Sequence, residues 1–140
     1  MKALCQFIFS EGDHMIKGVG TDIAEVERIK NNLRNDRFIK KIYSANEVDY
    51  LNKRKFNCQT AAGMFAAKEA VSKSLGTGFS NFGPCDIEIL KDESDKPYVN
   101  LLNNALILAN NLGITNIQVS ISHTVDLAIA FCVAESTEGN

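Results

Sequence analysis

The sequence predicts a single α+β domain in which an antiparallel sheet packs against a long central helix. Residues 16–23 alternate in polarity as a strand does, residues 62–75 carry apolar side chains at helical spacing, and residues 116–135 form two extended runs around a tight turn. Strands at both ends of a chain with helices between them are typical of an antiparallel α+β domain. A chain of 140 residues with 45% hydrophobic content fits one such domain with its own core.

The first 14 residues fit this pattern poorly. Their one lysine and very short apolar run resemble a signal peptide only weakly, whereas Met15 opens a much better patterned segment. We expect residues 1–14 to be a disordered, dispensable extension or the product of a misplaced start, and residues 15–140 to be the domain. No apolar run approaches the ~18 residues of a membrane span, so no membrane partner is expected.

The first strand places Gly18, Gly20 and Asp22 on one face. Because glycine weakens a strand, two on one side indicate that another element approaches the backbone closely beside Asp22. The Gly-Val-Gly sequence lacks the third glycine and the strand-turn-helix context of a dinucleotide-binding motif, so we reject that interpretation. The simpler alternative is a strand packed closely on a helix, with Asp22 capping a helix that begins near Glu25.

Two helices are expected before the central one. The first runs from Glu25 to about Asn35 and has a basic outer face. Ser44 and Glu47, three residues apart, form a capping box that opens a second helix running to about Lys53.

The central helix begins at Asn57 or Thr60 and ends at Gly76, where a left-handed C-cap is expected. Glu69 and Lys73 are four residues apart and therefore share one face of it. A hard cation could sit on the carboxylate and a phosphate on the lysine. The plain alternative is a solvated ion pair worth about 0.3–0.5 kcal/mol.

The remainder of the chain is expected to hold a hairpin, a helix and a second hairpin. Residues 86–91 and 97–101 alternate as paired strands around an acidic turn. A core helix follows at about 102–112, closed by Gly113. Its predicted core residues are Leu102, Ala105, Leu106, Leu108, Ala109 and Leu112.

The last hairpin carries His123 at its mouth, between strands at 116–122 and 127–135. A lone histidine at a strand end is more often a surface or hydrogen-bonded residue than a catalyst.

The net charge of −2 hides a strong asymmetry. Nine basic and three acidic residues lie between Arg28 and Lys55, a local charge of +6, so the remainder carries −8. Such a basic surface indicates an anionic partner, which could be nucleic acid, a membrane or an acidic protein, or else a solvated face. An RNA-binding domain would need aromatic residues interleaved with the basic ones for base stacking, and this segment does not show that pattern.

The cysteines form no Cys-x-x-Cys pair, so neither a zinc site nor a secreted disulfide framework is indicated. We expect reduced thiols in a cytoplasmic protein. The four are Cys5, Cys58, Cys85 and Cys132.

Asp22 and Glu69, together with lysines and the loop at 76–78, are a plausible set for Mg²⁺ bound to a phosphorylated substrate. Magnesium takes one or two protein carboxylates and fills its other positions with phosphate oxygens and water. Phosphoryl-type transfer needs alignment and charge neutralisation more than covalent help. Residue spacing does not identify the substrate.

Three stretches carry a specific resemblance. They are Gly-Val-Gly-Thr-Asp-Ile-Ala-Glu-Val-Glu-Arg (18–28), Phe-Ala-Ala-Lys-Glu-Ala-Val-Ser-Lys-Ser-Leu-Gly-Thr-Gly (65–78) and Ser-Ile-Ser-His (120–123). In this order they resemble the signatures of the 4′-phosphopantetheinyl transferases, and the short chain resembles the holo-acyl-carrier-protein synthase branch. The resemblance extends from Met15 to Glu135.

The resemblance implies that family's fold and the Mg²⁺-dependent transfer of phosphopantetheine from coenzyme A to a serine of an acidic acyl carrier protein, releasing adenosine 3′,5′-bisphosphate. It also implies a homotrimer with sites shared between neighbours, and a role in fatty acid biosynthesis or a secondary pathway. The implied residues are Asp22 and Glu69 for the metal, Lys73 near the pyrophosphate, His123 and Thr124 beside the coenzyme, Lys68 with Gly76, Thr77 and Gly78 around the nucleotide, and Arg28 and Arg37 for the carrier protein.

Two points stay open. Either Asp22 or Glu69 could accept the serine proton, directly or through water, and we favour Glu69. The family often has arginine where this chain has Met64, so one cationic contact is absent or supplied elsewhere, and we expect weaker substrate affinity before lost chemistry.

A non-catalytic module that binds coenzyme A is the alternative, against which the intact metal, lysine and histidine positions argue.

Overall fold

The computed structural model describes residues 15–137, and the expectation for residues 1–14 lies outside the described residues. The elements in chain order are β1 (Met15–Glu25), α1 (Val26–Asn32), α2 (Asp36–Ile42), α3 (Ala45–Lys53), α4 (Cys58–Ser74), the short 3-10 helix η1 (Pro84–Asp86), β2 (Ile87–Lys91), β3 (Pro97–Leu101), α5 (Asn103–Asn111), β4 (Asn116–His123) and β5 (Leu127–Ser136).

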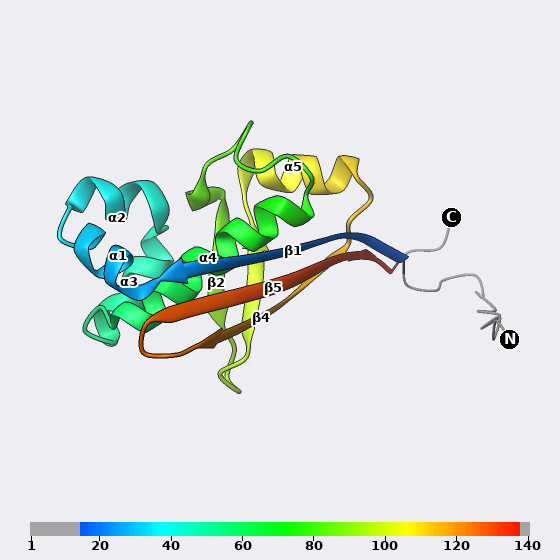
Figure 1. Ribbon diagram of the computed structural model, residues 1–140. Helices are drawn as coiled ribbons and strands as arrows, with labels where there is room; N and C mark the ends of the chain where they lie inside the picture. The colour runs from blue at the N-terminus through cyan, green and yellow to red at the C-terminus, as the bar shows by residue number, and fades with distance from the viewer. Residues whose placement is uncertain (1–14, 138–140) are drawn as a thin grey trace, which may run out of the picture.

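The described chain forms two antiparallel sheets around α4, which confirms the predicted α+β class. One sheet has three strands in the order β1-β5-β4, and the other is the β2-β3 hairpin. Figure 1 shows α4 running along the three-stranded sheet, with the short helices α1 to α3 gathered at one end and α5 at the other. Across the three-stranded sheet, Asp22 of β1 pairs with Ala130 of β5, which pairs in turn with Ile121 of β4. Ala24 of β1 pairs with Ala128 of β5, which pairs with His123 of β4.

Glycine allows β1 to approach α4 closely. A Cβ added at Gly18 would overlap the carbonyl oxygen of Ser74, and one added at Gly20 would overlap that of Ala70. The backbone of a packed helix cannot move aside as a flexible side chain can, so both positions require glycine. The predicted close approach beside Asp22 is confirmed, and the element that approaches is the central helix.

The central helix is buried on most of its circumference. Its alanines at 61, 62, 66, 67 and 70 are fully buried, so small side chains let strands and helices pack closely around it. Asn57 caps its start by accepting a hydrogen bond from the backbone N–H of Thr60 at 3.0 Å. Gly76 follows its end with φ of +82°, the left-handed conformation that glycine favours. Both predicted ends are confirmed.

The first predicted helix is wrong in extent. Helix α1 ends at Asn32, and α2 starts at Asp36 because the Asn35 side chain caps it, accepting from the N–H of Arg37 at 2.9 Å. The basic residues at 30, 34 and 37 therefore do not lie on one helix face. Asp22 is not a cap either, since β1 continues through Glu25 before α1 begins.

Other elements agree with prediction apart from the core face of α5. The Ser44 and Glu47 capping box is present at the start of α3, and the β2-β3 hairpin pairs as expected. On α5, Ala105 and Ala109 are buried, but Leu106 and Leu112 are 44% and 42% exposed. The α5 helix meets the core through Ala105 and Ala109, with partly buried Leu108 packed beside them.

Two further predictions concern cysteines and membranes. Cys58, Cys85 and Cys132 are free thiols, as expected. In the described part of the chain, no helix combines the length and apolar character needed to cross a membrane.

Candidate functional site

Asp22 and Glu69 come together although they are far apart in the sequence. The pleat of β1 points Asp22 to the same side as Gly18 and Gly20, toward α4, where Glu69 lies. Both side chains line one hollow of about 170 Å³, which we call the carboxylate pocket. Its other lining residues are Ile23, Ala24, Glu25, Arg28, Ile29 and Phe65.

Charges in the carboxylate pocket interact strongly. Lys73 Nζ donates to Asp22 Oδ1 and to the carbonyl oxygen of Thr21, both at 3.0 Å. Burial, and then the neighbouring charge of Asp22, raise the pKa of Glu69, while Lys73 and Arg28 act in the opposite direction. Burial of the Glu69 carboxylate and the nearby charge of Asp22 together outweigh the two cations.

The donor set fits magnesium better than a structural metal. Among residues 15–137, no group of three or more His, Cys, Asp or Glu side chains is arranged to hold a metal ion. Two carboxylates in one pocket match Mg²⁺, which leaves most of its positions to phosphate oxygens and water. A closed zinc site would need four protein ligands.

The loop after α4 presents bare backbone next to Lys73. Gly76 and Gly78 have φ of +82° and +60°, and an added Cβ at either would meet nothing within 4 Å. Thr77 between them is exposed. Glycine here serves the turn and leaves open space beside the last turn of the helix, where an anion could approach the lysine.

His123 lies at a second pocket. It lines a hollow of about 280 Å³, the His123 pocket, together with Tyr50 of α3, Gly63 and Met64 of α4, and Ile89 of β2. Because β4 and β1 lie on opposite sides of β5, His123 and Asp22 stand on different strands with β5 between them. The remaining lining residues are Gln59, Thr60, Lys91, Asp95, Pro97 and Ile121.

Thr124 shapes the turn beside His123. Its hydroxyl oxygen accepts from the backbone N–H groups of Asp126 and Leu127, at 3.3 and 3.1 Å. The side chain thus closes the β4-β5 turn.

The Lys68 side chain is buried and does not reach a ligand site, contrary to what the resemblance implies. Lys68 was expected near the nucleotide, but its side chain is only 1% exposed and lies 2.5 Å from Glu47 Oε1. It also donates to the carbonyl oxygens of Pro84 and Ile87, at 2.9 and 2.6 Å. Successive helix positions turn by about 100°, so Lys68 points into the interior while Glu69 faces the carboxylate pocket. With three hydrogen bonds made inside the protein, the ammonium has none left for a ligand.

Sequence reasoning included residues 53–55 in the basic segment but did not place them beside the His123 pocket. Lys53, Arg54 and Lys55 line a hollow at the start of α4 with Asn57 and Thr60, and Thr60 also lines the His123 pocket. Arg54 lies 3.7 Å from the ring centre of Tyr50. Three consecutive cations directly before a helix N-terminus were the available signal.

The two arginines expected to meet a carrier protein are both exposed. Arg28 lies on α1 and lines the carboxylate pocket, whereas Arg37 lies in the first turn of α2. Both helices lie at the same end of the molecule in Figure 1.

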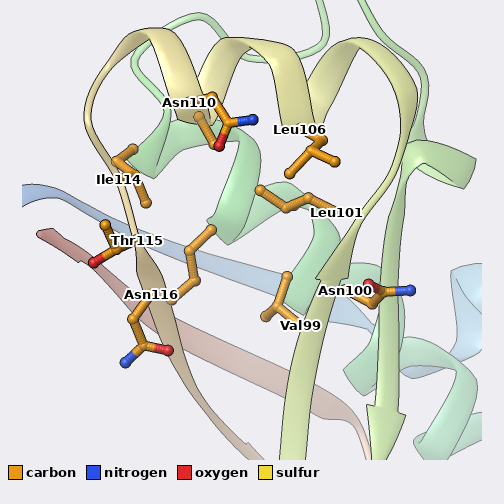
Figure 2. A pocket seen from close by; sticks show the side chains of 10 residues that line it. Val99, Asn100, Leu101, Leu106, Asn110, Ile114, Thr115 and Asn116 are labelled. Carbon is orange, nitrogen blue, oxygen red and sulfur yellow. The ribbon is translucent and has the colours of Figure 1, made fainter. Parts of the chain in front are cut away.

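Another hollow, of about 420 Å³, lies between β3, α5 and the start of β4 (Figure 2). It contains none of the predicted site residues. Its lining is apolar apart from amide and hydroxyl groups and has no titratable side chain, so it offers no group for acid–base or metal chemistry. The lining residues are Val99, Asn100, Leu101, Leu106, Ala109, Asn110, Ile114, Thr115, Asn116 and Ile117.

Comparison with known proteins identifies the family. The sequence model of the 4′-phosphopantetheinyl transferase superfamily matches residues 18–132. A holo-[acyl-carrier-protein] synthase from Clostridium botulinum is 52% identical over 122 residues, which cover 86% of this chain and 98% of that protein.

Solved structures give the same result. An acyl carrier protein synthase from Plasmodium yoelii with ADP bound superposes with a TM-score of 0.81 at 36% identity, covering 89% of this chain and 98% of that one. A holo-(acyl-carrier-protein) synthase from Bacillus anthracis in complex with CoA (3′,5′-ADP) has a TM-score of 0.72 at 34% identity, covering 87% and 98%.

Proposed function

The chain belongs to the 4′-phosphopantetheinyl transferase superfamily and is a transferase enzyme, and from this premise we propose that it moves 4′-phosphopantetheine from coenzyme A to a serine of an acyl carrier protein. The observation that carries the proposal is the convergence of Asp22 and Glu69 on one pocket, with Lys73 beside them. The coenzyme A bound in the Bacillus anthracis relative supports the choice of donor.

We propose that Asp22 and Glu69 hold Mg²⁺. When bound there, the ion would neutralise negative charge on the diphosphate of coenzyme A. Lys73 is exposed enough to turn from Asp22 toward a phosphate oxygen, since its side chain is 52% exposed. The open backbone at 76–78 leaves room for the substrate beside that lysine.

The transfer exchanges one phosphorus–oxygen bond for another. The serine oxygen bonds to the phosphorus that carries pantetheine, and the bond from that phosphorus to its bridging oxygen breaks, releasing adenosine 3′,5′-bisphosphate. The serine proton must go to a base, and we assign this role to Glu69, directly or through water. Burial and Asp22 raise the pKa of Glu69 in the metal-free pocket, which favours proton uptake, whereas bound Mg²⁺ would lower that pKa and so favour a water relay. Turnover retained by Glu69→Gln would exclude it as the base.

We assign the nucleotide end of coenzyme A to the His123 pocket and the adjoining basic run. Coenzyme A carries a third phosphate on its ribose, and the cations at 53–55 border the His123 pocket through Thr60. Met64 is only 4% exposed in the wall of that pocket, so positive charge must come from these neighbours. The weaker affinity expected from Met64 remains a prediction.

The carrier protein is proposed to dock on the basic end of the molecule. Exposed Arg28 adjoins the carboxylate pocket, and Arg37 lies on the next helix. An acidic partner would be attracted there before its serine reaches the pocket.

We also propose a homotrimer with shared sites. The face of the three-stranded sheet turned away from α4 exposes Val19 (55%), Ile23 (59%), Ile129 (45%) and Phe131 (49%), and we call it the outer sheet face. Such a contiguous apolar surface is typical of an interface. Because His123 and Asp22 stand on opposite edges of this sheet, a neighbour that packs on it could bring one protomer's His123 pocket to another's carboxylate pocket.

The cytoplasm is the proposed compartment, which the free thiols of Cys58, Cys85 and Cys132 support. Whether the carrier serves fatty acid biosynthesis or another pathway depends on which carrier is modified in the assay below.

The test is incubation with an apo-acyl carrier protein, coenzyme A and Mg²⁺, followed by intact mass measurement of the carrier. A gain of one phosphopantetheine that needs Mg²⁺ and the carrier's serine is expected. Binding of coenzyme A without any mass gain would instead indicate a non-catalytic module and would reject the proposal.

A further inference from the structure

A buried ion pair joins α3, α4 and β2 beside the His123 pocket. Lys68 and Glu47 are both 0% exposed, and Lys68 Nζ lies 2.5 Å from Glu47 Oε1. Lys68 also bonds to the carbonyl oxygens of Pro84 and Ile87. A buried charge with all its hydrogen bonds made holds its neighbours in a defined arrangement.

Glu47 extends these connections to the strand. Its Oε2 accepts from the backbone N–H of Ile89 at 3.0 Å, and its Oε1 accepts from that of Ser44 at 2.9 Å. Within residues 15–137, β2 pairs only with β3, so one edge of β2 has no neighbouring strand. On β2, Lys68 bonds to the carbonyl oxygen of Ile87 and Glu47 bonds to the N–H of Ile89. The pair therefore ties β2 to both helices.

The same three elements form the walls of the His123 pocket. Tyr50 lies three residues after Glu47 on α3, Met64 lies four residues before Lys68 on α4, and Ile89 bonds to Glu47 directly. Residues three or four apart on a helix share a face, so each wall residue sits next to the pair. A change in the pair would shift all three walls.

The carboxylate pocket is held by a different contact. There, α4 lies against β1 at Gly18 and Gly20, which touch the carbonyl groups of Ser74 and Ala70 rather than the Lys68 face. Loss of the ion pair should leave this contact in place. A substitution that removes the ion pair should therefore change the His123 pocket and leave the carboxylate pocket as it is.

We propose that Lys68 and Glu47 are positioning residues for the His123 pocket, which set the affinity for coenzyme A and leave the chemical step unchanged. The inference rests on the proposed function, which assigns the nucleotide to this pocket. Although Lys68 is adjacent to Glu69 in the sequence, it acts on the other pocket.

The experiment compares Glu47→Gln and Lys68→Met with the wild-type protein. For each, kcat, KM for coenzyme A and Mn²⁺ affinity in the absence of coenzyme A are measured. Ser74→Ala is the control, because Ser74 is also buried (5% exposed) on α4 but its hydroxyl donates to the carbonyl oxygen of Val71, six residues along the helix from Lys68.

Both test variants should raise KM for coenzyme A by about 10- to 100-fold, the size of effect that loss of an outer-shell partner has at metal sites, with kcat and Mn²⁺ affinity unchanged. Ser74→Ala should lower the melting temperature without moving KM. A fall in kcat at constant KM, a loss of Mn²⁺ affinity, or an equal KM effect in the control would overturn the proposal.

Two checks keep the result interpretable. If Lys68→Met does not fold, Glu47→Gln decides, because glutamine keeps an oxygen that can accept from Ile89. If the wild-type protein transfers nothing, the proposed function fails. Equilibrium dialysis of coenzyme A against the same variants then tests the ion pair by itself, with weaker binding expected and unchanged binding overturning it.

Discussion

Lys73 and Asp22 form an ion pair beside the carboxylate pocket, with Nζ and Oδ1 3.0 Å apart. The lysine is 52% exposed and the aspartate 18%, so the ammonium reaches inward from solvent to a mostly covered carboxylate. Because Asp22 is also a proposed Mg²⁺ ligand, lysine and metal compete for one carboxylate. The competition ends if Lys73 turns toward the diphosphate of coenzyme A.

Lys73→Met should therefore have opposite effects on metal and turnover. Without coenzyme A, Mn²⁺ should bind about 30-fold more tightly, because a divalent ion and an ammonium a few Å apart in water repel by about 2 kcal/mol. Transfer should slow, since a phosphate contact is lost. Electron paramagnetic resonance of free Mn²⁺ measures the first effect. Lys96→Met, in the exposed β2-β3 turn, is the control, and unchanged Mn²⁺ affinity in Lys73→Met would contradict the competition.

The pH dependence follows from Glu69. Burial and the charge of Asp22 raise its pKa in the folded protein, so the folded state takes up a proton at a pH where the unfolded state does not. In the absence of metal, the stability linked to this proton is fully present below the unfolded pKa and is lost as pH rises through the folded pKa. Glu69→Gln should remove that slope. Thermal unfolding of the wild-type protein and of Glu69→Gln, at pH values from below the unfolded pKa to above the folded pKa of Glu69, measures this change of stability with pH. An identical slope in the two proteins would be inconsistent with the raised pKa.

The close contact between β1 and α4 should be intolerant of even one methyl group. Gly20→Ala forces a Cβ onto the carbonyl oxygen of Ala70 and should lower the free energy of unfolding by about 1–3 kcal/mol. Gly83→Ala is the matched control, because a Cβ there meets nothing within 4 Å. Urea unfolding of both variants gives the comparison. Equal stability would mean that β1 and α4 are not in this contact.

The outer sheet face should control assembly. Phe131→Glu places a charge among its apolar side chains and should convert a trimer to monomers in sedimentation velocity. Ile107→Glu makes the same kind of change at a 57% exposed residue on α5 and should leave the trimer intact. If Phe131→Glu sediments as the wild-type protein does, the outer sheet face is not the interface.

Much of the fold was predictable because local signals were strong. The capping box at Ser44, the Asn57 cap and Gly76 fixed helix ends correctly, and the glycines of β1 predicted its close contact. The break between α1 and α2 depends on one cap at Asn35, which helical periodicity alone does not reveal.

The site was predictable only in part. Convergence of Asp22 and Glu69 followed from the motifs, but the inward direction of Lys68 depends on Glu47, its partner from a distant helix. Separation of His123 from Asp22 depends on strand order, because β5 enters between two strands that precede it in the chain. Such long-range placement has no local sequence signal.

The most direct test is Mn²⁺ binding, with and without coenzyme A, to the wild-type protein, Asp22→Asn and Glu69→Gln. Glu93→Gln, in the exposed hairpin turn, controls for loss of a carboxylate elsewhere. Coenzyme A should tighten Mn²⁺ binding to the wild-type protein and to Glu93→Gln, whereas each pocket variant should bind Mn²⁺ more weakly and lose this tightening. Equal Mn²⁺ binding by all four proteins would contradict the claim that Asp22 and Glu69 share one metal ion.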